Sequence, residues 1–259
     1  MSEFREVFAR KEIKYLLTQE QLDRLMPVLE TMAKVDKYGK TRINNIYFDT
    51  PDHRLIRTSL EKPIYKEKLR LRTYGRTSDD TNSFIEIKKK YDGIVYKRRI
   101  SAPYGKAMNY LLAGVEPLDD SQIAKEIEAF MLVYINLRPA MKICYDRIAM
   151  AGTLDPDFRV TFDSNLQWSV DSLDLREEVK GYSILAPGQY MMEIKAGDAM
   201  PLELARKMSE LSIFPASFSK YGKGYMDMME RNLSRKVSDK LADESTNSRS
   251  IERGVIIYA

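Results

Sequence analysis

Residues 66–99 carry basic side chains at two-residue spacing, the pattern of a charged strand face. Residues two apart on a β-strand share a face. Three runs alternate in this way, and their charged members are Lys68, Arg70 and Arg72, then Glu86, Lys88 and Lys90, then Lys97 and Arg99. The stretch holds eleven Lys and Arg against five Asp and Glu. It therefore predicts three neighbouring strands that each present a row of charge, mostly positive.

Two interpretations of these rows compete. A half-buried antiparallel sheet with an ordinary solvated face would also alternate charged and apolar residues. Like charges opposite each other on paired strands are destabilising, however, and a solvated face usually mixes its signs. The density of fixed positive charge favours an anionic ligand such as polyphosphate or nucleic acid.

The rare residue types limit the chemistry. The chain of 259 residues has one cysteine, Cys144, and one histidine, His53. A disulfide framework is excluded and a reducing compartment is expected. Zinc sites built on histidine, and Ser-His or Cys-His catalysis, are disfavoured. We expect any metal to be held by carboxylates and phosphate oxygens, which is typical of Mg²⁺ or Mn²⁺.

Bulk properties indicate a globular chain. Hydrophobic residues make up 44%, enough for a core, and the formal net charge is only +4, so an anion site needs a local concentration of charge. The first residues are charged and lack the apolar segment of a signal peptide. No stretch approaches 18 apolar residues. We therefore expect no transmembrane segment and a cytoplasmic protein.

The elements that must position the basic rows follow from apolar periodicity. Strands are expected at 7–17, 42–48, 68–74, 83–90, 94–100, 139–149, 158–162 and 190–195. Thr18 and Gln21 form an expected capping box for a helix to about Met32, which Pro27 should kink or divide. Further helices are expected around 54–59, 106–112, 119–134, 201–211 and 217–232.

Closing these strands into a barrel would place the basic rows in one lumen and leave no free sheet edge. We predict an α+β fold, an eight-stranded antiparallel closed β-barrel with helices packed outside. This domain spans residues 1–230. Residues 231–259 are polar and poor in aromatics, and are expected to form a mobile tail.

Eight short motifs occur along the chain in a recognisable order. They are R-x-E-x-K-Y (Arg10 to Tyr15), Y-F-D-T (Tyr47 to Thr50), K-L-R-L-R-x-Y-G (Lys68 to Gly75), F-I-E-I-K (Phe84 to Lys88), V-Y-K-R-R (Val95 to Arg99), Y-D-R-x-A (Tyr145 to Ala149), M-E-I-K (Met192 to Lys195) and S-K-Y (Ser219 to Tyr221). Over roughly residues 5–230 the chain resembles the VTC domain, the polyphosphate polymerase module of the vacuolar transporter chaperone complex. That domain is grouped with the CYTH proteins among the triphosphate tunnel metalloenzymes.

The resemblance implies a tunnel lined by Lys, Arg and Glu. There the γ-phosphate of ATP would be transferred onto polyphosphate with a divalent metal, preferably Mn²⁺ and otherwise Mg²⁺. The implied partners are a nucleoside triphosphate and polyphosphate. Matching by motif implies catalytic roles for Arg70, Arg72, Lys88 and Lys220, and further phosphate contacts from Lys14, Lys97, Arg99, Arg147 and Arg159. Glu193 matches the metal-binding carboxylate, and Glu12 and Glu86 are further candidates for metal binding or charge balance.

One departure bears on the reaction. Hydrolytic and cyclase members of the superfamily begin with E-x-E-x-K, whereas Arg10 stands here in place of the first glutamate. This favours the polymerase. The alternatives are a metal-dependent tripolyphosphatase or nucleoside triphosphatase, and a non-catalytic polyphosphate-binding module.

No nucleic-acid partner is expected. Binding of single strands would need exposed aromatics interleaved with the basic residues for stacking. We assign Tyr15, Phe84 and Tyr96 to the faces opposite the basic rows.

Overall fold

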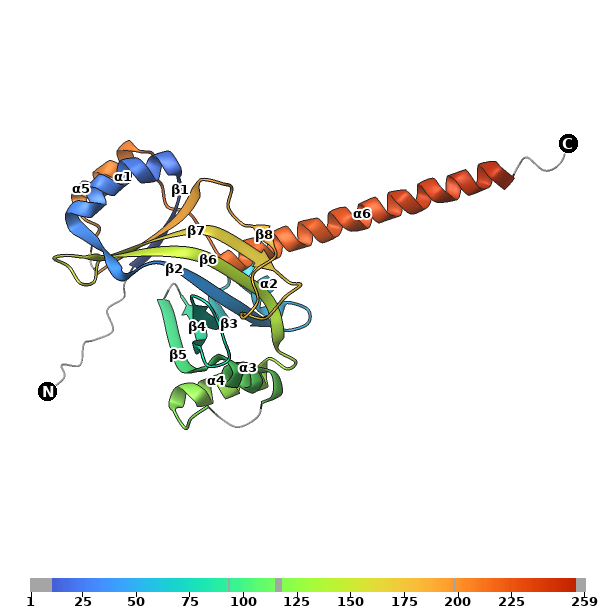
Figure 1. Ribbon diagram of the computed structural model, residues 1–259, viewed down its shortest axis with the longest axis horizontal. Helices are drawn as coiled ribbons and strands as arrows, with labels where there is room; N and C mark the ends of the chain where they lie inside the picture. The colour runs from blue at the N-terminus through green and yellow to red at the C-terminus, as the bar shows by residue number, and fades with distance from the viewer. Residues whose placement is uncertain (1–10, 93, 115–117, 198, 255–259) are drawn as a thin grey trace.

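The computed structural model describes residues 11–92, 94–114, 118–197 and 199–254 (Figure 1). Over these residues the chain forms nine β-strands and six α-helices. The strands are β1 (Lys11–Thr18), β2 (Ala33–Asp49), β3 (Tyr65–Tyr74), β4 (Asn82–Tyr91), β5 (Ile94–Pro103), β6 (Arg138–Gly152), β7 (Arg159–Ser169), β8 (Tyr182–Ser183) and β9 (Gln189–Ala196). The helices are α1 (Gln19–Met32), α2 (Arg54–Leu60), α3 (Tyr104–Ala113), α4 (Gln122–Val133), α5 (Leu202–Glu210) and α6 (Lys220–Gly254).

All of these strands belong to one antiparallel sheet. Its order is β1-β9-β7-β6-β2-β3-β4-β5, and the two-residue β8 pairs with β7 off this path. Each predicted strand overlaps an observed one, although residues 7–10 of the first lie outside the described part of the chain. The predicted α+β architecture with an antiparallel sheet is confirmed.

The predicted closure of the barrel needs correction. Within the described residues no hydrogen-bonded pairing joins β1 to β5, the two ends of the sheet. The free edge of β1 is already used, because the Lys14 carbonyl accepts a hydrogen bond of 2.7 Å from Ala216 N, and Tyr15 forms a bridge with Pro215. The two arms of the sheet meet through side chains instead, since Lys88 Nζ on β4 lies 3.8 Å from Glu12 on β1.

Two apolar clusters cover the outer face of the sheet. Leu69, Leu71, Ile85 and Ile87 point away from the charged rows and pack with buried residues of α3 and α4. The outer residues of β1, β7 and β9 pack in the same way against α1 and α5. Period-two alternation thus places one face of β1, β3, β4, β7 and β9 against the core and leaves the other for charge.

A third cluster lies on the inner face, where no helix was expected. The Tyr221 ring of α6 stacks on Tyr47 of β2 with centroids 4.6 Å apart. The Tyr221 hydroxyl donates a 2.8 Å hydrogen bond to Asp49. Met191 and Trp168 belong to the same buried cluster. The first turns of α6 therefore pack inside the curve of the sheet, so the prediction that helices lie only outside is wrong for α6.

Helix α1 begins as its sequence predicts. Gln21 N donates to Thr18 Oγ1 at 3.2 Å, and Thr18 N donates to the Gln21 side chain at 3.0 Å, which confirms the capping box. The helix is not divided at Pro27. Leu25 and Leu29 are buried on either side of this exposed proline, and their packing holds one continuous helix.

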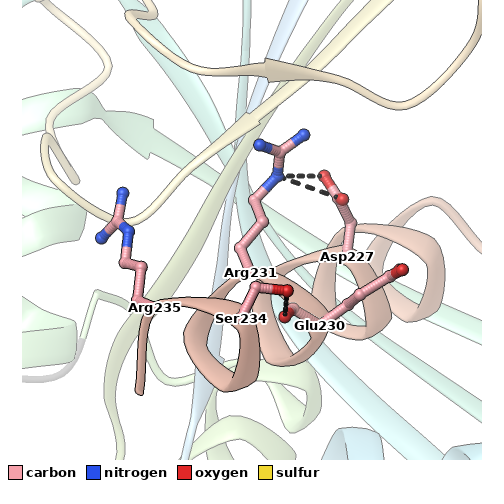
Figure 2. A pocket seen from close by; sticks show the side chains of 5 residues that line it. All are labelled: Asp227, Glu230, Arg231, Ser234 and Arg235. Carbon is pink, nitrogen blue, oxygen red and sulfur yellow. Dashed lines mark hydrogen bonds and ion pairs between the residues drawn. The ribbon is translucent and has the colours of Figure 1, made fainter. Parts of the chain in front are cut away.

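Helix α6 extends far beyond the predicted end near Asn232 and projects away from the sheet (Figure 1). Trp168 Nε1 donates to Asp227 at 2.7 Å, and the Arg231 guanidinium lies 3.9 Å from the centre of the Tyr182 ring. Figure 2 shows Asp227 and Arg231 facing each other on the helix. The mobility expected of residues 231–259 stays a prediction. None of the described helices combines the length and apolarity that crossing a bilayer requires.

Candidate active site

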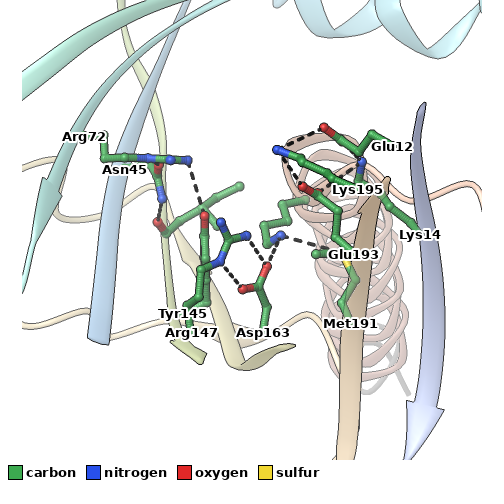
Figure 3. Close-up of polar contacts among 12 residues, drawn as sticks. Glu12, Lys14, Asn45, Arg72, Tyr145, Arg147, Asp163, Met191, Glu193 and Lys195 are labelled. Atoms are coloured by element: carbon green, nitrogen blue, oxygen red, sulfur yellow. Dashed lines mark hydrogen bonds and ion pairs between the residues drawn. The ribbon is translucent and has the colours of Figure 1, made fainter. Parts of the chain in front are cut away.

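The inner face of the sheet gathers ten cations and four carboxylates, which we call the lumen cluster. Figure 3 shows part of it, including Lys14, Arg147 and Glu193. The cations are Lys14, Lys68, Arg70, Arg72, Lys88, Lys97, Arg99, Arg147, Lys195 and Lys220, and the carboxylates are Glu12, Glu86, Asp163 and Glu193. They come from seven strands and the start of α6. The cations exceed the carboxylates by six charges, so the cluster is built to receive an anion.

Glu86 on β4 is the centre of one group of cations. Arg70 Nε lies 2.5 Å and Lys97 Nζ 2.6 Å from its carboxylate, and Arg72 Nε lies 3.9 Å away. Burial alone would raise the pKa of Glu86, but the charges of these cations outweigh it and lower the pKa to about 2. Glu86 therefore stays ionised and holds the β3 and β5 rows together.

Asp163 on β7 is the centre of a second group. Arg147 on β6 donates to both of its oxygens, at 2.6 and 2.8 Å, and Lys220 Nζ lies 2.6 Å away. The carboxylate is fully buried. Burial would raise the pKa of Asp163, but Lys220 and Arg147 together lower it. One carboxylate thus fixes cations from two elements that are distant in the sequence.

Glu193 on β9 and Glu12 on β1 share two lysines. The Glu193 carboxylate lies 3.4 Å from Lys14 Nζ and 3.2 Å from Lys195 Nζ. Glu12 is paired with Lys14 and lies 3.6 Å from Lys195. Burial would raise the pKa of Glu193, but Lys14 and Lys195 hold it well below its usual range. The contact of Glu12 with Lys88 connects this group to β4.

Lys68 of the cluster and its neighbour Tyr47 both have pKa values shifted to about 8. Lys68 Nζ donates to Ser219 Oγ at 3.0 Å, and burial lowers its pKa to about 8. Tyr47 accepts a 3.3 Å hydrogen bond from Arg70. Burial alone would raise the pKa of Tyr47, but Arg70 and Lys68 outweigh it and lower the pKa to about 8. As the pH rises through 8, Lys68 loses its positive charge and Tyr47 gains a negative charge.

Eleven of the twelve predicted site residues lie in the lumen cluster, and Arg159 does not. Arg159 begins β7 with its side chain 48% exposed, and its guanidinium lies 3.9 Å from Asp36 of β2. Arg99 lies at the border of the cluster, exposed, with its guanidinium 4.9 Å from the centre of the Phe84 ring. The individual roles in binding and catalysis stay predictions.

The structure adds residues that sequence reasoning did not assign to the site. Asp163 was missed because the strand was predicted to end at Phe162, seven residues before its observed end at Ser169, although Arg159 and Thr161 already marked its face. Lys68 and Lys195 share faces with predicted site residues, so the two-residue period could have found them. Tyr145 accepts a 3.3 Å hydrogen bond from Arg72.

The assignment of Phe84 to the face opposite the basic rows is wrong. Phe84 has the same parity as Glu86, and Arg99 packs over its ring. Tyr15 is buried in the outer core, as assigned. Tyr47 on the inner face is only 7% exposed and stacks on Tyr221, so it offers no open platform for a base. The absence of a nucleic-acid partner stays a prediction.

The carboxylates of the cluster suit a hard divalent cation in part. Glu12 and Glu193 converge on the same two lysines, whereas Glu86 and Asp163 are occupied by close cations. Among the described residues no group of three or more His, Cys, Asp or Glu is arranged to hold a metal. Mg²⁺ and Mn²⁺ sites of phosphoryl-transfer enzymes commonly take one or two carboxylates and complete their shell with phosphate oxygens and water. Glu193 and Glu12 fit that pattern.

Comparisons with known proteins place this site in a family context. The model of the VTC domain matches residues 9–229. A candidate adenylate cyclase from Bacillus halodurans superposes with a TM-score of 0.52 at 14% identity, covering 81% of this chain and 93% of that one. A candidate adenylyl cyclase from Hippeastrum, described as having a dominant triphosphatase activity, gives a TM-score of 0.50 at 14% identity, covering 84% and 96%. Comparison with the sequences of curated proteins returned no match.

Proposed function

The chain belongs to the VTC domain family, and on that premise we propose that it is a polyphosphate polymerase. It transfers the γ-phosphate of ATP onto the end of a polyphosphate chain. The observation that supports this proposal is the lumen cluster, in which ten cations surround only four carboxylates. A bound triphosphate would neutralise much of that excess, and Arg side chains can donate paired hydrogen bonds to its phosphate oxygens.

The reaction needs no protein nucleophile. A terminal phosphate oxygen of the growing chain attacks the γ-phosphorus, and a new P–O–P bond forms. The bond from the γ-phosphorus to the β–γ bridging oxygen breaks, and its electron pair leaves with ADP. Cys144 is buried, and the ring of His53 packs against Tyr225. Catalysis then rests on positioning and on stabilising the charge of the transferred group.

The chain's own residues divide this work. Arg70, Arg72 and Lys97 surround Glu86 and can turn from it to phosphate oxygens. Such side chains suit the binding of a polyphosphate that moves through the lumen. Arg147 and Lys220 are fixed by Asp163, which suits a constant geometry at the transferred phosphate. Lys14 and Lys88 converge on Glu12 from opposite arms of the sheet.

Glu193 and Glu12 would hold the divalent metal implied by the family. When bound, such a metal would neutralise charge on the β- and γ-phosphate oxygens. Ion pairing keeps both carboxylates ionised. Burial would raise the pKa of each, but Lys88 and Lys14 lower the pKa of Glu12, and Lys14 and Lys195 lower the pKa of Glu193. Manganese is preferred on the family resemblance, with magnesium as the alternative.

Hydrolysis of tripolyphosphate or of a nucleoside triphosphate is the second candidate. It is favoured by the shared fold with the Hippeastrum protein, which is described as a triphosphatase. The sequence argument against it rests on Arg10, which lies outside the described residues. A water molecule in place of the chain end would convert transfer into hydrolysis with the same cation set.

The test incubates the purified protein with ATP and Mn²⁺ and resolves the products by gel. Long polyphosphate supports the polymerase, free phosphate alone supports the hydrolase, and triphosphate binding without turnover supports a binding module. Arg70→Ala and Glu193→Ala should each abolish the product. Arg206→Ala removes an exposed arginine of α5 and should leave it unchanged.

A further inference from the structure

A hollow at one end of the basic rows is lined by three lysines. Its lining residues are Lys62, Pro63, Ile64, Lys66, Lys90, Asp92 and Ser217. Lys66 on β3 and Lys90 on β4 stand directly opposite each other in the strand register. Like charges opposite each other on paired strands cost stability unless something binds between them. Lys62 adds a third ammonium group, and of the lining residues that the structure describes only Asp92 is acidic.

The hollow continues the lumen cluster outward. Lys66 shares its face of β3 with Lys68, which is the next residue inward on that face. Lys90 likewise shares its face of β4 with Lys88. Lys68 in turn donates to Ser219, two residues from Ser217 in the hollow. A linear ligand that leaves the lumen along β3 and β4 therefore meets Lys66 and Lys90 next.

These lysines differ from most of the lumen cations, because no carboxylate partner is found for them among the described residues. Among the described residues no Asp or Glu lies within ion-pair distance of Lys62, Lys66 or Lys90, and the Lys66 ammonium instead donates to the Ser59 carbonyl at 3.2 Å. Partial burial, and then the charges of Lys90 and Lys62, lower the pKa of Lys66. The hollow therefore repels cations and favours an anion, which can bind there without displacing a carboxylate of the protein.

The chemistry of the hollow distinguishes a nucleoside from a continuing chain of phosphates. A nucleoside is uncharged beyond its phosphates, and its base is commonly held by an aromatic ring. Among the described residues, the lining has three ammonium groups and no aromatic side chain. A continuing chain of phosphates carries charge at every unit, and it suits this lining where a nucleoside does not.

We propose that the hollow of Lys62, Lys66 and Lys90 is a second polyanion subsite, which binds the polyphosphate chain beyond the phosphates held in the lumen. This rests on the proposed function, because it requires polyphosphate as a ligand. The nucleoside would then leave the lumen at the opposite end, and the chain has a defined direction along β3.

The test compares two ligands on one set of variants. Binding of tripolyphosphate and of a linear polyphosphate of uniform medium length is measured by calorimetry at several salt concentrations. The site variant carries Lys62→Gln, Lys66→Gln and Lys90→Gln. A matched control carries Lys106→Gln, Lys125→Gln and Lys180→Gln, which removes the same charge from three exposed positions away from the hollow.

The unaltered protein should bind the longer chain more tightly than tripolyphosphate. The site variant should lose about tenfold or more in affinity for the longer chain, and less than about twofold for tripolyphosphate, with a smaller salt dependence for the longer chain only. The control triple should change both affinities equally and slightly. Thermal melting of each variant checks that its fold is retained.

The outcomes separate this inference from the proposed function. If the unaltered protein binds neither ligand, the proposed function fails and this inference fails with it. If tripolyphosphate binds but the longer chain gains nothing, or the site variant keeps the gain, only the subsite is overturned. A third arm uses anionic phospholipid vesicles, because Ile64 is 70% exposed beside the lysines. Lysine-dependent vesicle binding without a loss of polyphosphate affinity would also overturn it.

Discussion

Glu86 and Asp163 both organise cations in the lumen, but they do so in different surroundings. The partners of Glu86 come from one continuous three-strand segment, and Lys97 among them is 41% exposed. The partners of Asp163 come from β6 and α6, and Lys220 is 11% exposed. The three-strand segment therefore builds a group that water reaches at Lys97, and the long-range contact builds a group whose lysine is largely covered, while both carboxylates are buried. The Asp163 group should matter more for stability, and the Glu86 group should adapt more readily to a ligand.

The largest effect is expected from Asp163→Asn. It leaves Arg147 and Lys220 buried without a carboxylate, which costs about 3–5 kcal/mol of unfolding free energy when a buried pair is broken. For a domain of this size the melting temperature should fall on the order of 10 °C. Asp36→Asn breaks the exposed contact with Arg159 and should cost less than about 1 kcal/mol. Equal losses in the two variants would contradict the comparison.

Glu86→Gln should cost less, about 1–3 kcal/mol, because Lys97 can turn to water. The sign of its pH dependence is defined. The folded pKa of Glu86 is about 2, below its ordinary 4.5, so its contribution is present above pH 4.5 and is lost as the pH falls towards 2. Acid denaturation followed by circular dichroism should show a shallower loss for Glu86→Gln in that window. An unchanged slope would mean that Glu86 is not the group responsible.

Affinity for tripolyphosphate should weaken several-fold between pH 7 and 9. Lys68 loses its positive charge and Tyr47 gains a negative one near pH 8, and both changes disfavour an anion. Lys68→Arg keeps the charge at all of these pH values and should flatten most of the dependence, and Tyr47→Phe should flatten the rest. Calorimetry across this range would refute the assignment if both variants kept the slope of the unaltered protein.

The smallest effect is expected from Arg159→Gln, which should change triphosphate affinity by less than about twofold because this exposed side chain lies at the rim. Arg147→Gln is the matched substitution inside the lumen and should weaken binding by about tenfold or more. An equal loss from the two substitutions would place Arg159 among the phosphate ligands, as the motif resemblance implied.

The sequence predicted the strands and the charged face more fully than their long-range arrangement. Arg70, Arg72 and Lys88 could be placed because the two-residue period is local. Asp163 could not, since its importance comes from Arg147 and Lys220, which lie 16 and 57 positions away in the chain. The occupied edge of β1 was equally hidden, because it depends on Ala216 reaching Lys14.

Helix α6 is longer than the sequence predicts for a related reason. The sequence predicts an end near Asn232 because the residues after Leu233 lack an apolar stripe, yet Lys, Arg, Glu and Ser are acceptable helix formers. The inner position of its first turns depends on Tyr221 meeting Tyr47, a contact between residues far apart in the sequence.

The same helix makes a mechanical connection. Lys220, which holds Asp163 in the lumen, is the first residue of α6, and at 1.5 Å per residue the helix reaches about 50 Å from it. A rod of that length acts as a lever with its short arm in the lumen. A force that tilts or turns its far end would act through the contacts of Asp227 with Trp168 and of Arg231 with Tyr182, and then on Lys220 and Tyr221 beside the proposed phosphate ligands.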